Sequence, residues 1–167
     1  MVEFRPERIL QVLAAHQVDY IMIGGLAAAV HGSDLVTGDL DITPATGDEN
    51  LARLSRALDE LDARIRTDTE PDGLPFAHDP TSLAGGAVWN LVTNAGDLDL
   101  AMMPSGTQGY DDLRRDAIAI KILGVPTRVA ALADVIRSKE AAGREKDRAA
   151  LPMLRRLQTE IERRRQR

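Results

Sequence analysis

Two aspartates separated by one leucine, Asp39 and Asp41, stand in an otherwise apolar segment. Successive side chains of an extended strand point to opposite faces, so both carboxylates share one face. Like charges repel there unless a cation lies between them, and Mg²⁺ or Mn²⁺ takes such oxygen ligands. The pattern predicts a metal-binding strand. An edge strand with one solvated face is the alternative, because alternation by itself produces the same sequence.

A glycine pair precedes these aspartates. Residues 20–23 are apolar and predict a buried strand, Gly24 and Gly25 follow, and residues 26–31 can form a short helix. Glycines at a strand-to-helix turn allow positive φ and close approach of a ligand to the backbone. Free N–H groups at a helix start also attract anions. The pair therefore predicts a phosphate-binding turn, or a turn that needs glycine for its conformation alone.

A second acidic segment lies later in the chain. Residues 87–93 and 97–102 flank Asn94-Ala95-Gly96, which predicts a hairpin with a glycine-containing turn. The second arm again places two aspartates, Asp97 and Asp99, on one face. The chain thus contains a second strand candidate with two aspartates on one face.

Basic residues gather after residue 138. Lys139 continues the apolar face of a helix that starts at Leu132, where it either extends to the solvent or reaches a buried anion. Gly143 ends this helix, and Arg144, Lys146 and Asp147 open the next one.

Together, the glycine pair, the short helix and Asp39-x-Asp41 resemble the signature of the DNA polymerase β-type nucleotidyltransferase superfamily. More narrowly, the chain resembles the small bacterial nucleotidyltransferases related to AbiEii-type toxins. The resemblance implies that Gly24 and Gly25 hold a triphosphate and that Asp39 and Asp41 bind Mg²⁺ or Mn²⁺. It also implies that Asp99 is the third metal ligand, with Asp97 as a turn residue or a supporting group.

The order of Lys139, Arg144, Lys146 and Asp147 is similar to the C-terminal signature of the AbiEii-like group. The resemblance implies that the three cations face the nucleotide and that Asp147 orients Lys139 or Arg144. Related proteins often carry an Arg-x-Thr-x-Asp run before the first metal acid. Here Thr37 is present as a candidate supporting residue, whereas Leu35 occupies the arginine position and Gly25 the position of a serine.

The resemblance implies an enzyme that moves a nucleoside monophosphate from a nucleoside triphosphate to an acceptor hydroxyl. An RNA 3′ end or a protein side chain would be the acceptor of a toxin-like enzyme, and a cognate antitoxin its partner. The aminoglycoside and lincosamide nucleotidyltransferases share the same glycine and Asp-x-Asp pattern, which makes antibiotic modification a second hypothesis. A nucleotide-binding module or antitoxin-like interaction module is a third. An aromatic content of 3% argues against a base-stacking platform.

The expected fold is α+β, a nucleotidyltransferase fold with a mixed β-sheet flanked by helices and a C-terminal helical pair. We expect one domain over residues 1–167, with a core of about 18–130 and C-terminal helices over about 131–165. Further helices are expected over residues 6–17, 48–61 and 110–117, strands over 63–67, 118–122 and 126–129, and a long loop over 68–86.

Composition limits the protein class. The 167 residues are 44% hydrophobic and 28% charged, as in ordinary globular domains, and no cysteine is present. The N-terminus lacks the order of a secretory signal and no apolar run spans a bilayer, so we expect a cytoplasmic protein without membrane contact. The formal net charge is −5, yet residues 155–167 carry a local +4. This basic end either contacts RNA or an acidic partner, or is a solvated helix end.

Overall fold

Seven strands form one mixed sheet in the computed structural model, which describes residues 2–167. The strand order is β3-β4-β5-β2-β1-β7-β6; β1 runs parallel to β7 and β2 parallel to β5, and the other neighbours are antiparallel. The strands are β1 Tyr20–Ile23, β2 Asp39–Pro44, β3 Arg64–Ile65, β4 Val88–Thr93, β5 Gly96–Ala101, β6 Ile118–Ile122 and β7 Val125–Val129.

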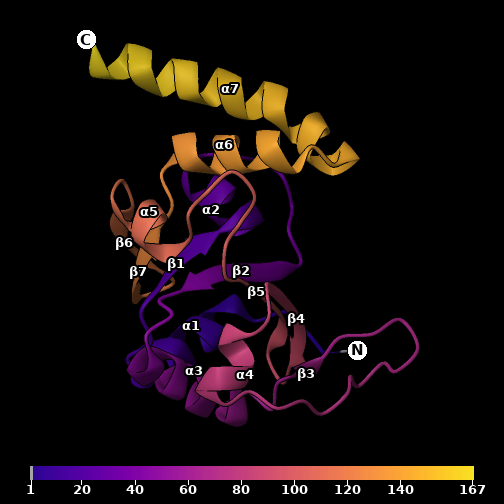
Figure 1. The fold of residues 1–167 in the computed structure, drawn as a ribbon. Coiled ribbons are helices and arrows are strands. Elements are labelled where there is room, and N and C mark those ends of the chain that lie inside the picture. The colour runs from indigo at the N-terminus through magenta and orange to yellow at the C-terminus, as the bar shows by residue number, and fades with distance from the viewer. Residues whose placement is uncertain (1) are drawn as a thin grey trace.

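Helices cover both faces of this sheet. Figure 1 shows α1, α3 and α4 on one side, and α2 on the other side beneath α6 and α7. The helices are α1 Pro6–Ala15, α2 Gly24–Val30, α3 Asp48–Glu60, α4 Pro80–Ala84, α5 Tyr110–Arg114, α6 Leu132–Ala142 and α7 Glu145–Arg165. The α+β class with a flanked mixed sheet and a C-terminal helical pair is therefore confirmed.

Alternation along the central strands separates the core from the polar face. In β2 and β5 the aliphatic side chains Leu40, Ile42, Leu98 and Leu100 are fully buried, while the aspartates between them are partly exposed. The buried side chains belong to the same core as the apolar stripe of α3, which contains Leu51, Leu54 and Leu58. Burial of one face thus fixes the strand register and turns every acid of β2 and β5 to the opposite face.

The predicted long loop is partly wrong, because residues 68–86 contain α4. Asp79 caps this helix by accepting a hydrogen bond from the Ser82 N–H at 3.4 Å, and Pro80 occupies the first turn. Asp-Pro is a helix-start signal that a search for apolar periodicity overlooks in a five-residue helix. The expected strand over 63–67 is also shorter than predicted, since β3 spans two residues.

The C-terminal helical pair is joined by a tight corner. Gly143 ends α6 with φ +61°, in the left-handed region that favours glycine, as the sequence predicts. A reciprocal capping arrangement of Arg144 and Asp147 starts α7. Among residues 2–167, none of the helices is long and apolar enough to cross a membrane.

Candidate active site

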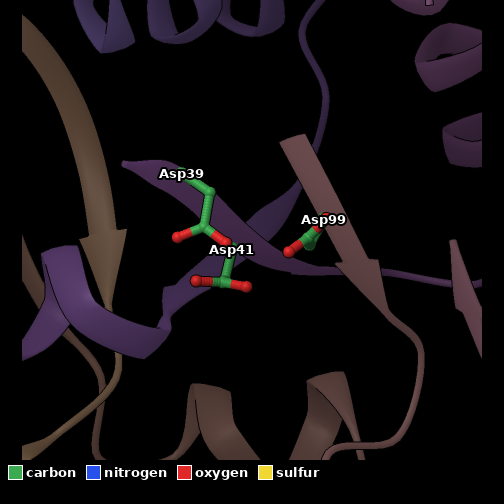
Figure 2. Close-up of side chains that lie close together, drawn as sticks. All are labelled: Asp39, Asp41 and Asp99. Atoms are coloured by element: carbon green, nitrogen blue, oxygen red, sulfur yellow. The ribbon is translucent and has the colours of Figure 1, made fainter. Parts of the chain in front are cut away.

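Three carboxylates from two neighbouring strands converge on the polar face of the sheet (Figure 2). Parallel pairing of β2 with β5 sets Asp39 beside Asp97 and Asp41 beside Asp99. One oxygen from each of Asp39, Asp41 and Asp99 lies within 4.8 Å of the other two. The strand alternation that buries the leucines therefore also assembles a group of oxygen ligands suited to a divalent ion.

The charges of this group are poorly compensated by the protein itself. Burial, followed by the neighbouring charges of Asp39 and Asp99, raises the pKa of Asp41 to about 7, although Lys146 and Lys139 oppose the rise. Burial and a hydrogen bond with Asp39 raise the pKa of Asp99 to about 6, against the effect of Arg66. Raised carboxylate pKa values of this kind are typical of functional sites and mark a place where a cation is favoured.

Both glycines are required by side chains that pack on them. Gly24 begins α2 with φ +72°, and a Cβ there would collide with the Asp41 carboxylate. A Cβ on Gly25 would lie 2.8 Å from the Cβ of Thr37. The helix begins at the first glycine and not two residues later as predicted. The pair therefore lets the start of α2 approach β2 closely.

Thr37 supports the first metal-ligand candidate. Its hydroxyl donates to Asp39 Oδ1 at 2.9 Å, from the loop that connects α2 to β2. The supporting position predicted for Thr37 is thus matched by a direct contact with Asp39. Leu35, which occupies the arginine position of related proteins, is instead 48% exposed.

Arg66 is a member of the site that the sequence analysis missed. Its guanidinium lies 3.2 Å from Asp97 Oδ2 and 3.0 Å from Asp99 Oδ1, and it also donates to the Leu91 carbonyl. Asp97 is therefore paired with an arginine and lies outside the cluster of three acids. An arginine that alternates with Ile65 in a short strand carries no local signal of this role, because the contact depends on the pairing of β3 with β4.

A basic wall faces the acids from the helical pair. Asp147 is fully buried and accepts a hydrogen bond from Arg144 Nε at 2.7 Å, while Lys139 Nζ lies 3.6 Å from its other oxygen. Burial alone would raise the pKa of Asp147, but the hydrogen bond and charge of Arg144, together with the charge of Lys139, lower it. Asp147 thus contacts both cations, and Lys146 is exposed.

The acids, the glycines and the basic wall line one cleft of about 830 Å³. Ten of the eleven residues singled out in the sequence line it: Gly24, Gly25, Thr37, Asp39, Asp41, Asp99, Lys139, Arg144, Lys146 and Asp147. Asp97 is the exception, because Arg66 binds it. A cleft with oxygen ligands on one wall and cations on the other suits a metal-bound polyphosphate.

Comparison with known proteins identifies the fold. No protein-family model matches the chain, and no curated protein matches it in sequence. Among solved structures, the chain is similar to LnuA, a lincosamide antibiotic adenylyltransferase, with a TM-score of 0.60 and 13% identity over 91% of this chain and 95% of that one. It is also similar to a nucleotidyltransferase candidate from Thermotoga maritima, with a TM-score of 0.54 and 16% identity over 91% and 94%. The chain therefore has the nucleotidyltransferase fold.

Proposed function

We propose that the protein transfers a nucleoside monophosphate from a nucleoside triphosphate to an acceptor hydroxyl. The observation that carries the proposal is the convergence of Asp39, Asp41 and Asp99 opposite Lys139 and Arg144 across one cleft. The nucleotidyltransferase fold of the chain supports it, since the same topology occurs in an enzyme that adenylylates lincosamides.

The acidic cluster fits a divalent metal ion. Three hard oxygen donors lie within 4.8 Å of one another, and the raised pKa values of Asp41 and Asp99 indicate that positive charge is in deficit there. Asp39, Asp41 and Asp99 would hold Mg²⁺ or Mn²⁺. When bound, such an ion supplies charge neutralisation for the triphosphate and polarises the phosphorus under attack.

The residues of the chain perform the remaining tasks. Lys139, Arg144 and Lys146 bind the triphosphate oxygens, assisted by the N–H groups at the start of α2. Arg66 pairs with Oδ1 of Asp99 and orients its carboxylate, which receives the proton of the acceptor hydroxyl. The hydroxyl oxygen forms a bond to the α-phosphorus, the bond to pyrophosphate breaks, and pyrophosphate leaves. Positioning and electrostatic complementarity supply most of the rate in such reactions.

A transfer assay with an α-labelled triphosphate and Mg²⁺ tests this function. Label should pass to an acceptor from a cell extract with the wild-type protein and not with Asp41→Asn, which keeps the side-chain volume and removes a ligand charge. Full transfer by Asp41→Asn would exclude the mechanism. No metal-dependent nucleotide binding by the wild type would favour an interaction module.

Two biological roles are compatible with this reaction. The AbiEii-like sequence pattern favours a toxin-like enzyme that acts on RNA or protein and has a cognate antitoxin. This toxin hypothesis rests on sequence resemblance alone. The structural likeness to LnuA favours a small-molecule acceptor, with lincomycin as the compound to assay first. Growth arrest on expression, relieved by Asp41→Asn, would support the toxin role, whereas label on lincomycin would support antibiotic modification.

A further inference from the structure

Exposed apolar side chains gather at the mouth of the cleft. Among residues 2–167, nine large hydrophobic side chains are exposed, and four of them line this cleft: Leu35, Val36, Val88 and Met103. Val36 is 99% exposed and Met103 63% exposed. Scattered exposed aliphatic residues are normal on a protein surface, but a cluster of them rimming a cleft marks a ligand-binding surface.

This apolar rim lies beside Asp99. In the β4–β5 hairpin, Asn90 pairs with Asp99 and Val88 pairs with Ala101, so these four side chains share one face of the sheet. Met103 follows β5 directly, and Leu35 and Val36 come from the loop that precedes Asp39. The side chain of Asn90 is exposed and has no hydrogen-bond partner within the described part of the chain. The face next to Asp99 thus presents exposed aliphatic groups and one free amide, and the segment after Met103 adds Ser105 and Thr107 to the lining.

The cations of the cleft come from other elements than the apolar rim. Lys139, Arg144 and Lys146 are the basic residues of the lining, and all three belong to α6, α7 and the corner between them. Their charges act on Asp41. The hairpin and the loop over residues 35–38 contribute no basic residue to the lining, and Arg66 is already bound to Asp97 and Asp99.

This separation distinguishes the two substrates of the proposed reaction. The basic side matches a triphosphate. The side at Asp99, where the acceptor hydroxyl must approach, would leave the phosphates of a nucleic acid without counter-charges, although such charges dominate nucleic-acid affinity. A volume of about 830 Å³ is also typical of small-molecule sites and leaves room for a compact acceptor beside a nucleotide.

We propose that the acceptor is a compact, hydroxyl-bearing organic molecule that carries an uncharged apolar face. Its apolar face packs on Val36, Val88 and Met103, and the Asn90 amide hydrogen-bonds a polar group next to the reacting hydroxyl. The proposal rests on the proposed function and specifies its acceptor class. RNA and protein side chains are the competing classes.

Calorimetric binding of two neutral glycosides tests the proposal. The probes are octyl glucoside below its micelle concentration and methyl glucoside, each added to the full chain with Mg²⁺ and a non-hydrolysable α,β-methylene triphosphate. Both probes offer the same hydroxyls, and only the first has an apolar tail. We expect octyl glucoside to bind at least about tenfold more tightly, because its alkyl chain is removed from water on the rim.

A matched pair of lysine substitutions locates the binding. Met103→Lys should remove the octyl preference, whereas Leu123→Lys should preserve it, since Leu123 is 61% exposed and lies outside the cleft. Asn90→Leu should weaken the binding of both glycosides to the same extent. Nucleotide affinity measured on each variant reports folding and the integrity of the basic side.

The outcomes separate this proposal from the proposed function. If the triphosphate analogue does not bind the wild type with Mg²⁺, the proposed function fails. If the analogue binds but the two glucosides bind equally, or Met103→Lys and Leu123→Lys behave alike, the acceptor class is wrong. Preferential transfer of label to a short single-stranded RNA or to the protein itself would also overturn it.

Discussion

Asp41 combines a buried carboxylate with two acidic neighbours, an arrangement that opposes folding in the absence of a cation. Its pKa in the folded chain is about 7, above its ordinary value of 3.8. Between these two pH values the folded state binds more protons than the unfolded state. The contribution of Asp41 to stability is therefore greatest at low pH and falls as pH rises through about 7.

We therefore expect Asp41→Asn to stabilise the metal-free protein at pH 8 while abolishing transfer. The gain should be about 1–3 kcal/mol, or ~5 °C in Tm, and should shrink toward pH 4 because the wild-type carboxyl is protonated there. Thermal unfolding of the wild type and Asp41→Asn, in the presence of a chelator and at several pH values, measures this gain in stability. Equal pH dependence of the two proteins would contradict the electrostatic account of the site.

In the proposed reaction Arg66 acts through Asp99 and not on the nucleotide, because it pairs with Asp99 and the basic residues that line the cleft lie between residues 139 and 146. Arg66→Met should lower kcat about 10–100-fold and leave KM for the triphosphate nearly unchanged. Loss of the guanidinium should also raise the pKa of Asp99, so the acidic limb of the pH–rate profile should move to higher pH.

Arg64→Met is the matched control for that substitution. Arg64 lies in β3, two residues before Arg66, where it donates to the Gly73 carbonyl and forms no ion pair within residues 2–167. The substitution Arg64→Met should leave kcat and the pH–rate profile unchanged. If both variants lose activity equally, or if Arg66→Met raises KM alone, the positioning role of Arg66 is wrong.

The close packing of α2 on β2 determines where the acids lie. Alanine normally stabilises a helix relative to glycine by about 1 kcal/mol. At Gly25 the steric term outweighs this preference, because a Cβ would lie 2.8 Å from Thr37. The loop would have to move, and Asp39 would lose its hydrogen bond from the Thr37 hydroxyl.

Gly25→Ala should consequently lower transfer about 10–100-fold without unfolding the chain. Gly38→Ala is the control, since no atom lies within 4 Å of a Cβ there, and it should retain activity. Transfer rates of Gly25→Ala and Gly38→Ala at saturating triphosphate measure the difference. Full activity of Gly25→Ala would show that the spacing of α2 and β2 is not critical.

The junction of α6 and α7 depends on one buried charge. Asp147 is fully buried, caps α7 and pairs with Lys139 and Arg144. Asp147→Asn should destabilise the protein by about 3 kcal/mol, ~10 °C in Tm, because two cations lose their counter-charge. It should also weaken triphosphate binding, since both cations line the cleft.

Glu160→Gln serves as the comparison on the same helix. Glu160 is 59% exposed and pairs with Arg164, which is 76% exposed. An exposed pair of this kind contributes little to stability, so Tm should be nearly unchanged. Differential scanning calorimetry distinguishes the two variants, and similar values of Tm would contradict the structural role of Asp147.

The elements that the sequence predicts well are those with a strong local pattern. Strict alternation predicts β2, β5 and their shared acidic face, and Gly143 predicts the end of α6. The α4 helix was missed because five residues show no period, and Arg66 because its contacts require the register of three strands. Local patterns therefore predict the strand faces that carry the three clustered acids, whereas the contacts of Arg66 depend on tertiary pairing.

The cleft lies between the sheet and the helical pair, and the two contribute different charged groups. The three clustered acids come from the sheet, and the basic residues of the lining all come from residues 139–146. The arginine-rich C-terminal end of α7 extends away from the sheet in Figure 1. Its side chains are mostly exposed, consistent with the solvated helix end weighed from the sequence.

The proposed function requires that Asp39, Asp41 and Asp99 form a divalent-metal site that binds a nucleoside triphosphate. Calorimetric titration of the α,β-methylene triphosphate into the full chain, with Mg²⁺ or with chelator, tests this requirement. We expect saturable binding that requires Mg²⁺ and is lost in Asp41→Asn, although that variant is folded. Equal affinity with chelator, or undiminished Mg²⁺-dependent binding by Asp41→Asn, would contradict it.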